Sequence, residues 1–109
     1  MSEYTEIQKP VNDYLRERER AGELTWQHIE KGAHHKQRTH RAGWPDLTIY
    51  LEYGHVVFIE LKMPGKKLSP SQVDIFKRLG RLGFRCYLCH SLADVKLALS
   101  DYWGQVCKK

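Results

Sequence analysis

Hydrophobic residues recur at helical spacing near the start of the chain, at Ile7, Val11, Tyr14 and Leu15. Together with the charged run that follows them, they predict an amphipathic helix over about residues 5–21. Thr5 and Gln8 fit a capping box at its start. Pro10 lies past the first turn, where its missing N–H removes a helical hydrogen bond, so we expect a bend there.

The middle of the chain changes to the spacing of strands. Residues 24–29 predict a first strand, and residues 47–51 and 55–63 predict a hairpin around Tyr53-Gly54. The second hairpin strand is apolar at nearly every position, which indicates that both of its faces are buried. A Pro-Gly pair at 64–65 then ends it.

A second helix, a last strand and a last helix complete the order. The stretch 69–72 (Ser-Pro-Ser-Gln) is a strong helix start, and Gly83 is the expected stop. Residues 84–89 predict a strand, and Ser91 caps the last helix. The expected buried residues of the two helices are Val73, Phe76, Leu79 and Leu82, then Val95, Ala98, Leu99 and Tyr102. The predicted order is αβββαβα, a mixed α/β fold.

Length and composition narrow the class of protein. The chain allows one compact domain over residues 1–109, and its 41% hydrophobic and 28% charged residues are typical of a globular protein, not a disordered one. No apolar run approaches the roughly 20 residues that span a bilayer, and no hydrophobic signal segment is visible, so we expect no membrane contact and a cytoplasmic location. Three cysteines cannot all pair within one chain, which favours reduced thiols.

One segment matches a cofactor motif. Cys86, Cys89 and His90 have the spacing of covalent haem attachment. On a strand, however, the two cysteines point to opposite faces, because the number of residues between them is even. We therefore expect neither haem nor zinc there. The three histidines between residues 34 and 40 have no cysteine or acid at ligand spacing and are expected in a loop.

The net charge is +5, and the surplus cations lie on both sides of residues 43–60. The segment 31–41 holds four cations, three histidines and no acid, and the segment 62–85 holds seven cations and one acid. A basic surface of this kind favours a polyanionic partner, most simply nucleic acid. The candidate phosphate contacts are Lys36, Arg38, Arg41, Lys66 and Lys67.

Two acids and a lysine lie within the predicted hairpin. Strand alternation puts Glu60 and Lys62 on one face. A three- or five-residue turn around Tyr53 pairs residues whose numbers sum to 106 and places Asp46 opposite Glu60, with Cβ atoms about 5 Å apart. A two-residue turn would instead put Asp46 beside Leu61, on the other face.

Paired carboxylates at that separation repel each other unless a cation lies between them. Hard oxygen ligands of this kind select Mg²⁺ or Mn²⁺. Lys62 would orient or help to deprotonate a metal-bound water, or neutralise charge on a phosphate in the transition state. These parts suffice for phosphodiester hydrolysis. An ordinary Glu–Lys pair on a half-exposed strand is less compatible with the apolar residues around it.

These residues also resemble a known family. Pro45-Asp46 followed by Glu60-Leu61-Lys62 resembles the PD-(D/E)xK nuclease superfamily, and residues 43–46 together with 69–72 resemble its VRR-NUC family. The resemblance extends from Glu6-Ile7-Gln8 to the last predicted strand. It implies an αβββαβ restriction-endonuclease-like core, here with an extra C-terminal helix, and cleavage of nucleic acid that depends on Mg²⁺ or Mn²⁺.

The resemblance also assigns roles to residues. It implies as metal ligands Asp46, Glu60 and the backbone carbonyl of Leu61, with Lys62 completing the site. Glu6 matches an acid on the family's first helix and would approach the metal or its water, although the helix dipole also explains an acid there. Gln72 matches a family glutamine that would contact Lys62, the water or a phosphate, although capping also accounts for it. Trp44 departs from the family's small or aliphatic residue.

Small free-standing VRR-NUC proteins are often viral, and this chain resembles them more than the modules fused to larger repair enzymes. Resemblance to Holliday junction resolvases implies a homodimer, since two symmetry-related active sites suit a four-way junction. The predicted function is a metal-dependent endodeoxyribonuclease for branched DNA in DNA repair, located in a bacterial host cytoplasm if viral. The alternatives are cleavage of flaps or linear duplex, a restriction-like enzyme, and a catalytically silent nucleic-acid-binding module.

Overall fold

The computed structural model describes residues 3–29 and 41–107, and its helices and strands follow the predicted order, which confirms the α/β class. A π-helical turn opens the first helix, and a 3₁₀ turn joins the hairpin strands. The elements are η1 (Tyr4–Gln8), α1 (Lys9–Arg20), β1 (Leu24–His28), β2 (Leu47–Leu51), η2 (Glu52–Gly54), β3 (Val56–Leu61), α2 (Pro70–Arg81), β4 (Arg85–Cys89) and α3 (Leu92–Cys107).

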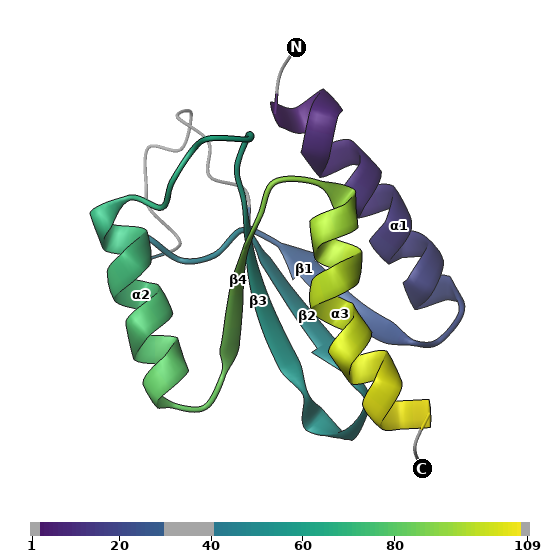
Figure 1. The fold of residues 1–109 in the computed structure, drawn as a ribbon. Helices are drawn as coiled ribbons and strands as arrows, with labels where there is room; N and C mark the ends of the chain where they lie inside the picture. Colours follow the sequence, from purple (N-terminus) through teal and green to yellow (C-terminus); the bar gives the residue numbers. More distant parts are fainter. Residues whose placement is uncertain (1–2, 30–40, 108–109) are drawn as a thin grey trace.

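The strands form one mixed sheet in the order β1-β2-β3-β4. The β1–β2 and β2–β3 pairs are antiparallel, whereas β3 and β4 are parallel. A parallel pair needs a crossover connection, which α2 supplies. In Figure 1, α1 and α3 lie on one side of the sheet and α2 lies on the other. Because β3 and β4 run in the same direction, the C-terminal ends of both strands lie at the same end of the sheet.

Each face of the sheet carries its own hydrophobic cluster. The cluster on the α1 and α3 side contains Ile7, Val11, Leu15, Leu24, Leu47, Ile49, Leu51, Val57, Ile59, Leu61, Cys89, Val95, Leu99 and Tyr102. The cluster on the α2 side contains Phe58, Ile75 and Leu79. Side chains of β3 alternate between the two clusters, so the prediction that this strand is buried on both faces is confirmed.

Pro10 is accommodated by a change of helix type. The π-helical turn η1 ends at Gln8, and Pro10 then lies in the first turn of α1. Gln8 itself has helical φ and ψ, so the helix is continuous here, and the hydrogen bond that Pro10 does not make is lost where the helix changes type. The helix starts close to the predicted residue, since η1 begins at Tyr4, but Thr5 lies inside the helical turn and not at its N-cap. The Gln8 side chain, expected in a capping box, instead contacts the ring of His28 in β1.

The buried stripe of α2 differs from the prediction. Val73 and Leu82 are 37% and 74% exposed, so they are not part of the core. Ile75 and Leu79 are buried instead, and Phe76 is half-buried. This short helix carries two sets of apolar residues on different faces. The face that packs against β3 and β4 carries Ile75 and Leu79, which are four residues apart, so this set is the buried one.

The β2–β3 hairpin turns through the three residues Glu52–Gly54, and Tyr53 adopts a left-handed backbone conformation with φ of 61°. Leu47 pairs with Ile59, a pair whose numbers sum to 106, as do those of the other pairs in this ladder. The prediction based on a three-residue turn is therefore confirmed, and the two-residue alternative is wrong.

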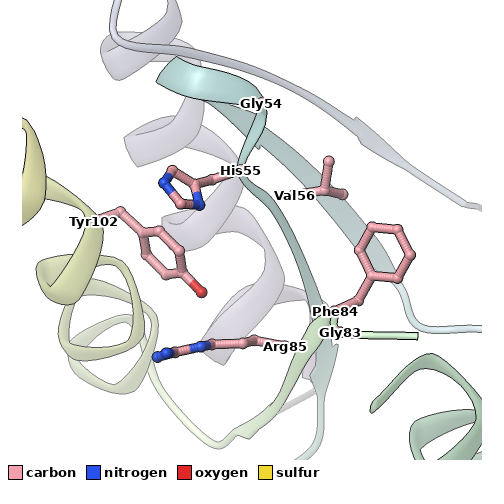
Figure 2. A pocket seen from close by; sticks show the side chains of 7 residues that line it. All are labelled: Gly54, His55, Val56, Gly83, Phe84, Arg85 and Tyr102. Atoms are coloured by element: carbon pink, nitrogen blue, oxygen red, sulfur yellow. The ribbon is translucent and has the colours of Figure 1, made fainter. Parts of the chain in front are cut away.

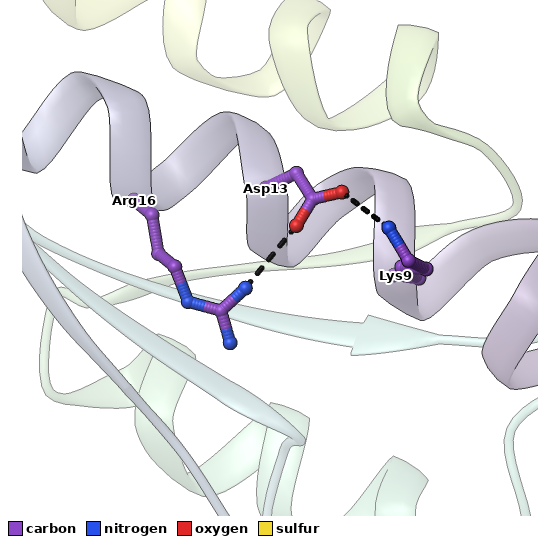
Figure 3. A network of polar contacts seen from close by, with 3 residues as sticks. All are labelled: Lys9, Asp13 and Arg16. Carbon is purple, nitrogen blue, oxygen red and sulfur yellow. Dashed lines mark hydrogen bonds and ion pairs between the residues drawn. The ribbon is translucent and has the colours of Figure 1, made fainter.

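The outward face of α1 is polar. Asp13 accepts hydrogen bonds from Lys9 at 2.9 Å and from Arg16 at 3.2 Å (Figure 3). These contacts, the hydrogen bond from Lys9 foremost, hold the pKa of Asp13 below its ordinary value. The three side chains are exposed, so solvent screens the pairs and they add little to stability. Within the described ranges, no helix is long and apolar enough to cross a membrane.

Candidate active site

Asp46 and Glu60 face each other at one end of the β2–β3 hairpin. The last ladder pair there is Leu47–Ile59, and Asp46 and Glu60 are the next residues beyond that pair on the two strands. Asp46 Oδ2 accepts a hydrogen bond from the Leu61 N–H at 2.8 Å, so this carboxylate lies against the peptide that follows Glu60. The Glu60 side chain is buried, with 3% exposed. The hairpin thus brings the two predicted acids together.

Gln72 joins Glu60 to the first turn of α2. Its Nε2 donates to Glu60 Oε2 at 3.0 Å, and its Oε1 accepts from the Ser69 N–H at 2.8 Å. Ser69 Oγ in turn accepts the Gln72 N–H at 3.3 Å, which completes the predicted capping box. From the sequence, capping of the helix and contact with the site were alternative roles for Gln72. In the structure its side chain does both. Its partner is a carboxylate rather than the lysine, water or phosphate considered above.

Gly43 allows the loop before Asp46 to touch α2. Its φ is +86°, and a Cβ at this position would lie 2.4 Å from the carbonyl oxygen of Ser71. Next to it, the Trp44 ring packs edge-on against Phe58, with ring centroids 5.7 Å apart. The sequence marked Gly43 as part of a motif but did not predict its contact with α2. A glycine just before a site acid was the available signal for a close backbone approach.

Lys62 directly follows β3 and is half-buried. Its N–H donates to the Cys89 carbonyl at 3.1 Å, which extends the parallel pairing with β4 by one residue. Side-chain alternation from Glu60 puts Lys62 on the α2 side of the sheet. Asp46, Glu60 and Lys62 therefore share one end of the hairpin, where β3 and β4 also stop.

The oxygen ligands at this end of the hairpin suit a hard divalent cation. Carboxylate oxygens are the ligands that such a cation prefers, and Asp46 and Glu60 supply them on either side of the Leu61 N–H contact. A cation also offsets the desolvation of a buried carboxylate. Within residues 3–29 and 41–107, no three His, Cys, Asp or Glu side chains form a metal cluster, so backbone oxygens and water would complete the coordination. Glu6 is exposed in η1, and its role stays a prediction.

The predicted phosphate contacts fall in three places. Arg41 is exposed in the loop that leads to the acids. Lys66 and Lys67 are exposed between β3 and α2, in the segment that leaves the site. Lys36 and Arg38 lie outside the described residues. The three described cations therefore lie on both sides of the acids along the chain and are accessible to a large polyanion.

The cysteines of the haem-like motif lie in different clusters. Cys89 is buried with the α1 and α3 side chains, whereas Cys86 packs against the cluster under α2, so their predicted opposite orientation is confirmed. Burial raises the pKa of the Cys86 thiol to about 11, and burial, with a smaller effect of the Asp94 charge, raises that of Cys89 to about 12. Both are therefore protonated, unreactive thiols near neutral pH.

A pocket of about 170 Å³ lies at the opposite end of β3 and β4 (Figure 2). It is lined by Gly54, His55, Val56, Gly83, Phe84, Arg85 and Tyr102. The ring of His55 packs against that of Tyr102, with centroids 5.4 Å apart. No carboxylate lines this pocket, so we assign it no part in metal binding.

The mixed sheet and its flanking helices are those of a restriction-endonuclease-like nuclease fold. The sequence profile of the VRR-NUC domain matches residues 4–93, and the chain therefore belongs to the VRR-NUC domain family, as predicted.

Solved structures agree with this assignment. One described as "VRR_NUC domain" is 25% identical, with a TM-score of 0.64 over 86% of this chain and 95% of that chain. Another, described as "VRR_NUC domain protein", is 24% identical, with a TM-score of 0.55 over 71% of this chain and 66% of that chain, and its likeness shows the fold alone. No curated protein sequence matches this chain. The family is one of nucleases, which generally depend on divalent metal ions.

Proposed function

We propose that this chain is a divalent-metal-dependent endonuclease that hydrolyses phosphodiester bonds of DNA. The observation that carries the proposal is the hydrogen bond of 2.8 Å from the Leu61 N–H to Asp46, which puts this carboxylate against the peptide between Glu60 and Lys62. Glu60 is a buried carboxylate with 3% exposed, and a buried carboxylate with a second acid nearby favours a bound cation. A protein that only binds nucleic acid has no need of paired acids next to a basic surface.

Each residue of the site has a distinct role in this proposal. Asp46, Glu60 and the Leu61 carbonyl would hold Mg²⁺ or Mn²⁺, and such an ion supplies Lewis-acid activation of the phosphate and of a water molecule. Lys62 places a positive charge where negative charge develops on the phosphate. Gln72 holds the Glu60 carboxylate in one orientation through its bond of 3.0 Å.

The cations around the site provide the DNA contacts. Arg41 precedes the acids in the chain, and Lys66 and Lys67 follow them, so phosphates on either side of the scissile bond have partners. The N-terminus of α2 begins shortly after Lys67 and adds a favourable dipole for phosphate. Lys36 and Arg38 belong to the same proposal, and Glu6 is proposed to approach the metal through water.

Cleavage of labelled DNA tests the chemistry. Wild-type protein should cut with Mg²⁺ or Mn²⁺ and not with EDTA, and Lys62→Ala should lose at least about 100-fold in rate. Lys96→Ala is the matched control, because Lys96 lies on α3, 5.1 Å from the Tyr14 ring and on the other side of the sheet. Equal rates for the two variants would remove Lys62 from the chemistry.

A catalytically silent nucleic-acid-binding module is the second candidate, favoured by the basic segments alone. The two functions differ in their need for a metal ion, since cleavage requires it and backbone binding does not. Tight DNA binding in EDTA, without cleavage at any Mg²⁺ or Mn²⁺ concentration, would favour the silent module.

We further propose that the preferred substrate is a four-way junction and that the active form is a homodimer. Support comes from the resemblance to junction resolvases, whose two symmetry-related active sites suit a four-way junction. A junction and a linear duplex of the same sequence should be cut at clearly different rates, and light scattering should give twice the mass of 12.8 kDa. Equal cutting of both substrates would contradict the structure-specific part, and a monomer that cuts junctions would contradict the dimer.

A further inference from the structure

The His90 ring lies where β3 and β4 end. Its Nδ1 is 3.1 Å from the Lys62 carbonyl oxygen and 3.1 Å from the Met63 carbonyl oxygen. His90 directly follows β4, whose Cys89 carbonyl accepts the Lys62 N–H at 3.1 Å. The histidine side chain therefore continues the contact between the two strands beyond their last backbone hydrogen bond.

The two carbonyl partners of His90 determine whether its Nδ1 carries a hydrogen. Both are carbonyl oxygens, which only accept, so Nδ1 must carry the hydrogen. One N–H shared between two oxygens is a three-centre hydrogen bond. The Nδ1–H tautomer and the imidazolium both make this contact, so it does not depend on whether Nε2 is protonated.

His90 is itself held by the first turn of α3. Its backbone N–H donates to Asp94 Oδ2 at 2.8 Å, and the Asp94 N–H donates to Ser91 Oγ at 3.1 Å. On the other side, the Met63 carbonyl also accepts the Lys66 N–H at 3.0 Å. The ring therefore connects a capped helix to the turn that leaves the candidate active site.

We propose that His90 is a positioning residue for Lys62: its Nδ1–H holds the two carbonyls that follow the Lys62 Cα, and this directs the Lys62 side chain toward Asp46 and Glu60. The proposal rests on the proposed role of Lys62. β3 ends at Leu61, so the ladder orders the Lys62 backbone only through its N–H. The histidine supplies the missing restraint on the carbonyl side.

This role also explains the motif that matches haem attachment. Cys86 and Cys89 pack into the two clusters of the sheet, and the histidine that follows them contacts the residues just after β3. The three residues therefore have separate structural roles and do not form a joint site.

His90→Asn and His90→Leu form a matched pair for the test. The two new side chains have nearly the same size, and only asparagine keeps an N–H donor near the position of Nδ1. The measurements are the single-turnover cleavage rate at saturating DNA with Mn²⁺, and the Kd for DNA. We expect His90→Leu to lower the rate about 10–100-fold and His90→Asn to stay within about threefold of wild type, with Kd unchanged in both. Equal rates in the two variants, or a loss in Kd alone, would overturn the proposal.

Both variants must unfold cooperatively by circular dichroism. If His90→Leu does not, His90→Gln replaces it, because its amide is one carbon further from the backbone and should show the same loss of rate. Lys62→Ala separates this proposal from the proposed function. A Lys62→Ala protein that cleaves at the wild-type rate refutes the role of Lys62. An inactive Lys62→Ala protein beside a fully active His90→Leu protein refutes only the role of His90.

Discussion

Replacing Gly43 by alanine is the most selective perturbation of the site that touches none of the proposed reacting groups. Gly43 has a φ of +86°, and an added Cβ would lie 2.4 Å from the Ser71 carbonyl oxygen, 2.6 Å from the Ser71 carbonyl carbon and 3.1 Å from the Gln72 nitrogen. Ordinary contacts begin at 3.4 Å, so the loop and the first turn of α2 must separate by about 1 Å. These two segments carry Asp46 and Gln72.

The expected cost has two parts. A left-handed backbone costs a residue with a Cβ about 1–2 kcal/mol, and forcing an extra carbon into a packed contact costs about 1–3 kcal/mol. Gly43→Ala should therefore lower the free energy of unfolding by about 2–5 kcal/mol. A shift of about 1 Å between the two segments should also lower the cleavage rate about 100-fold.

Gly22→Ala is the control. Gly22 has a φ of +79° in the turn between α1 and β1, and an added Cβ there meets nothing within 4 Å. It should cost only the backbone part, about 1–2 kcal/mol, and leave cleavage unchanged. Urea unfolding measures both variants, provided that their m-values agree. If Gly43→Ala loses no more stability than Gly22→Ala, the close approach to α2 is wrong. If it is destabilised but cleaves normally, the contact does not position the site.

Three further outcomes are expected. Gln72→Glu should keep the helix cap but place a second carboxylate against Glu60, so chelator-treated protein should lose about 1–3 kcal/mol of unfolding free energy in urea, and an unchanged value would contradict the contact. Burial raises the pKa of the Cys89 thiol from near 9, its ordinary value, to about 12 in the folded protein. Between these two values the thiolate therefore forms mainly in the unfolded chain. Alkylation at pH 8 should be at least about 100-fold slower than in urea, and stability should be constant below pH 9 and fall above it. A double alanine variant of Lys66 and Lys67 should reduce the slope of log Kd for DNA against log salt by about 2, and an unchanged slope would remove both from the interface.

Features that depend on neighbouring residues in the chain were predictable. The cap of α2 arises from Ser69, Pro70 and Gln72 acting within one turn, and it forms as predicted. The hairpin register was not decided by the sequence, because the three-residue turn needs Tyr53 at a positive φ, which bulky residues seldom adopt.

Features that depend on contacts between distant segments were not predictable. Which stripe of α2 is buried depends on how the helix lies on β3 and β4, so Val73 was assigned to the core and Ile75 was not. The contacts of Gly43 with Ser71 and of His90 with Lys62 join residues 28 positions apart in both cases, and no local pattern encodes them. That Asp46 and Glu60 lie near each other could be predicted, because strand alternation and a single register relation are enough to place them at one end of the hairpin.

The central claim is that Asp46 and Glu60 form a metal site that cleaves DNA, and one comparison tests it most directly. Single-turnover cleavage of a four-way junction is measured for wild type and for Asp46→Asn, which has nearly the same shape but no charge, with Mn²⁺ and with EDTA. Wild type should cleave only with the metal, and Asp46→Asn should lose at least about 100-fold in rate while remaining folded. Cleavage by Asp46→Asn at the wild-type rate, or cleavage by either protein in EDTA, would contradict the account.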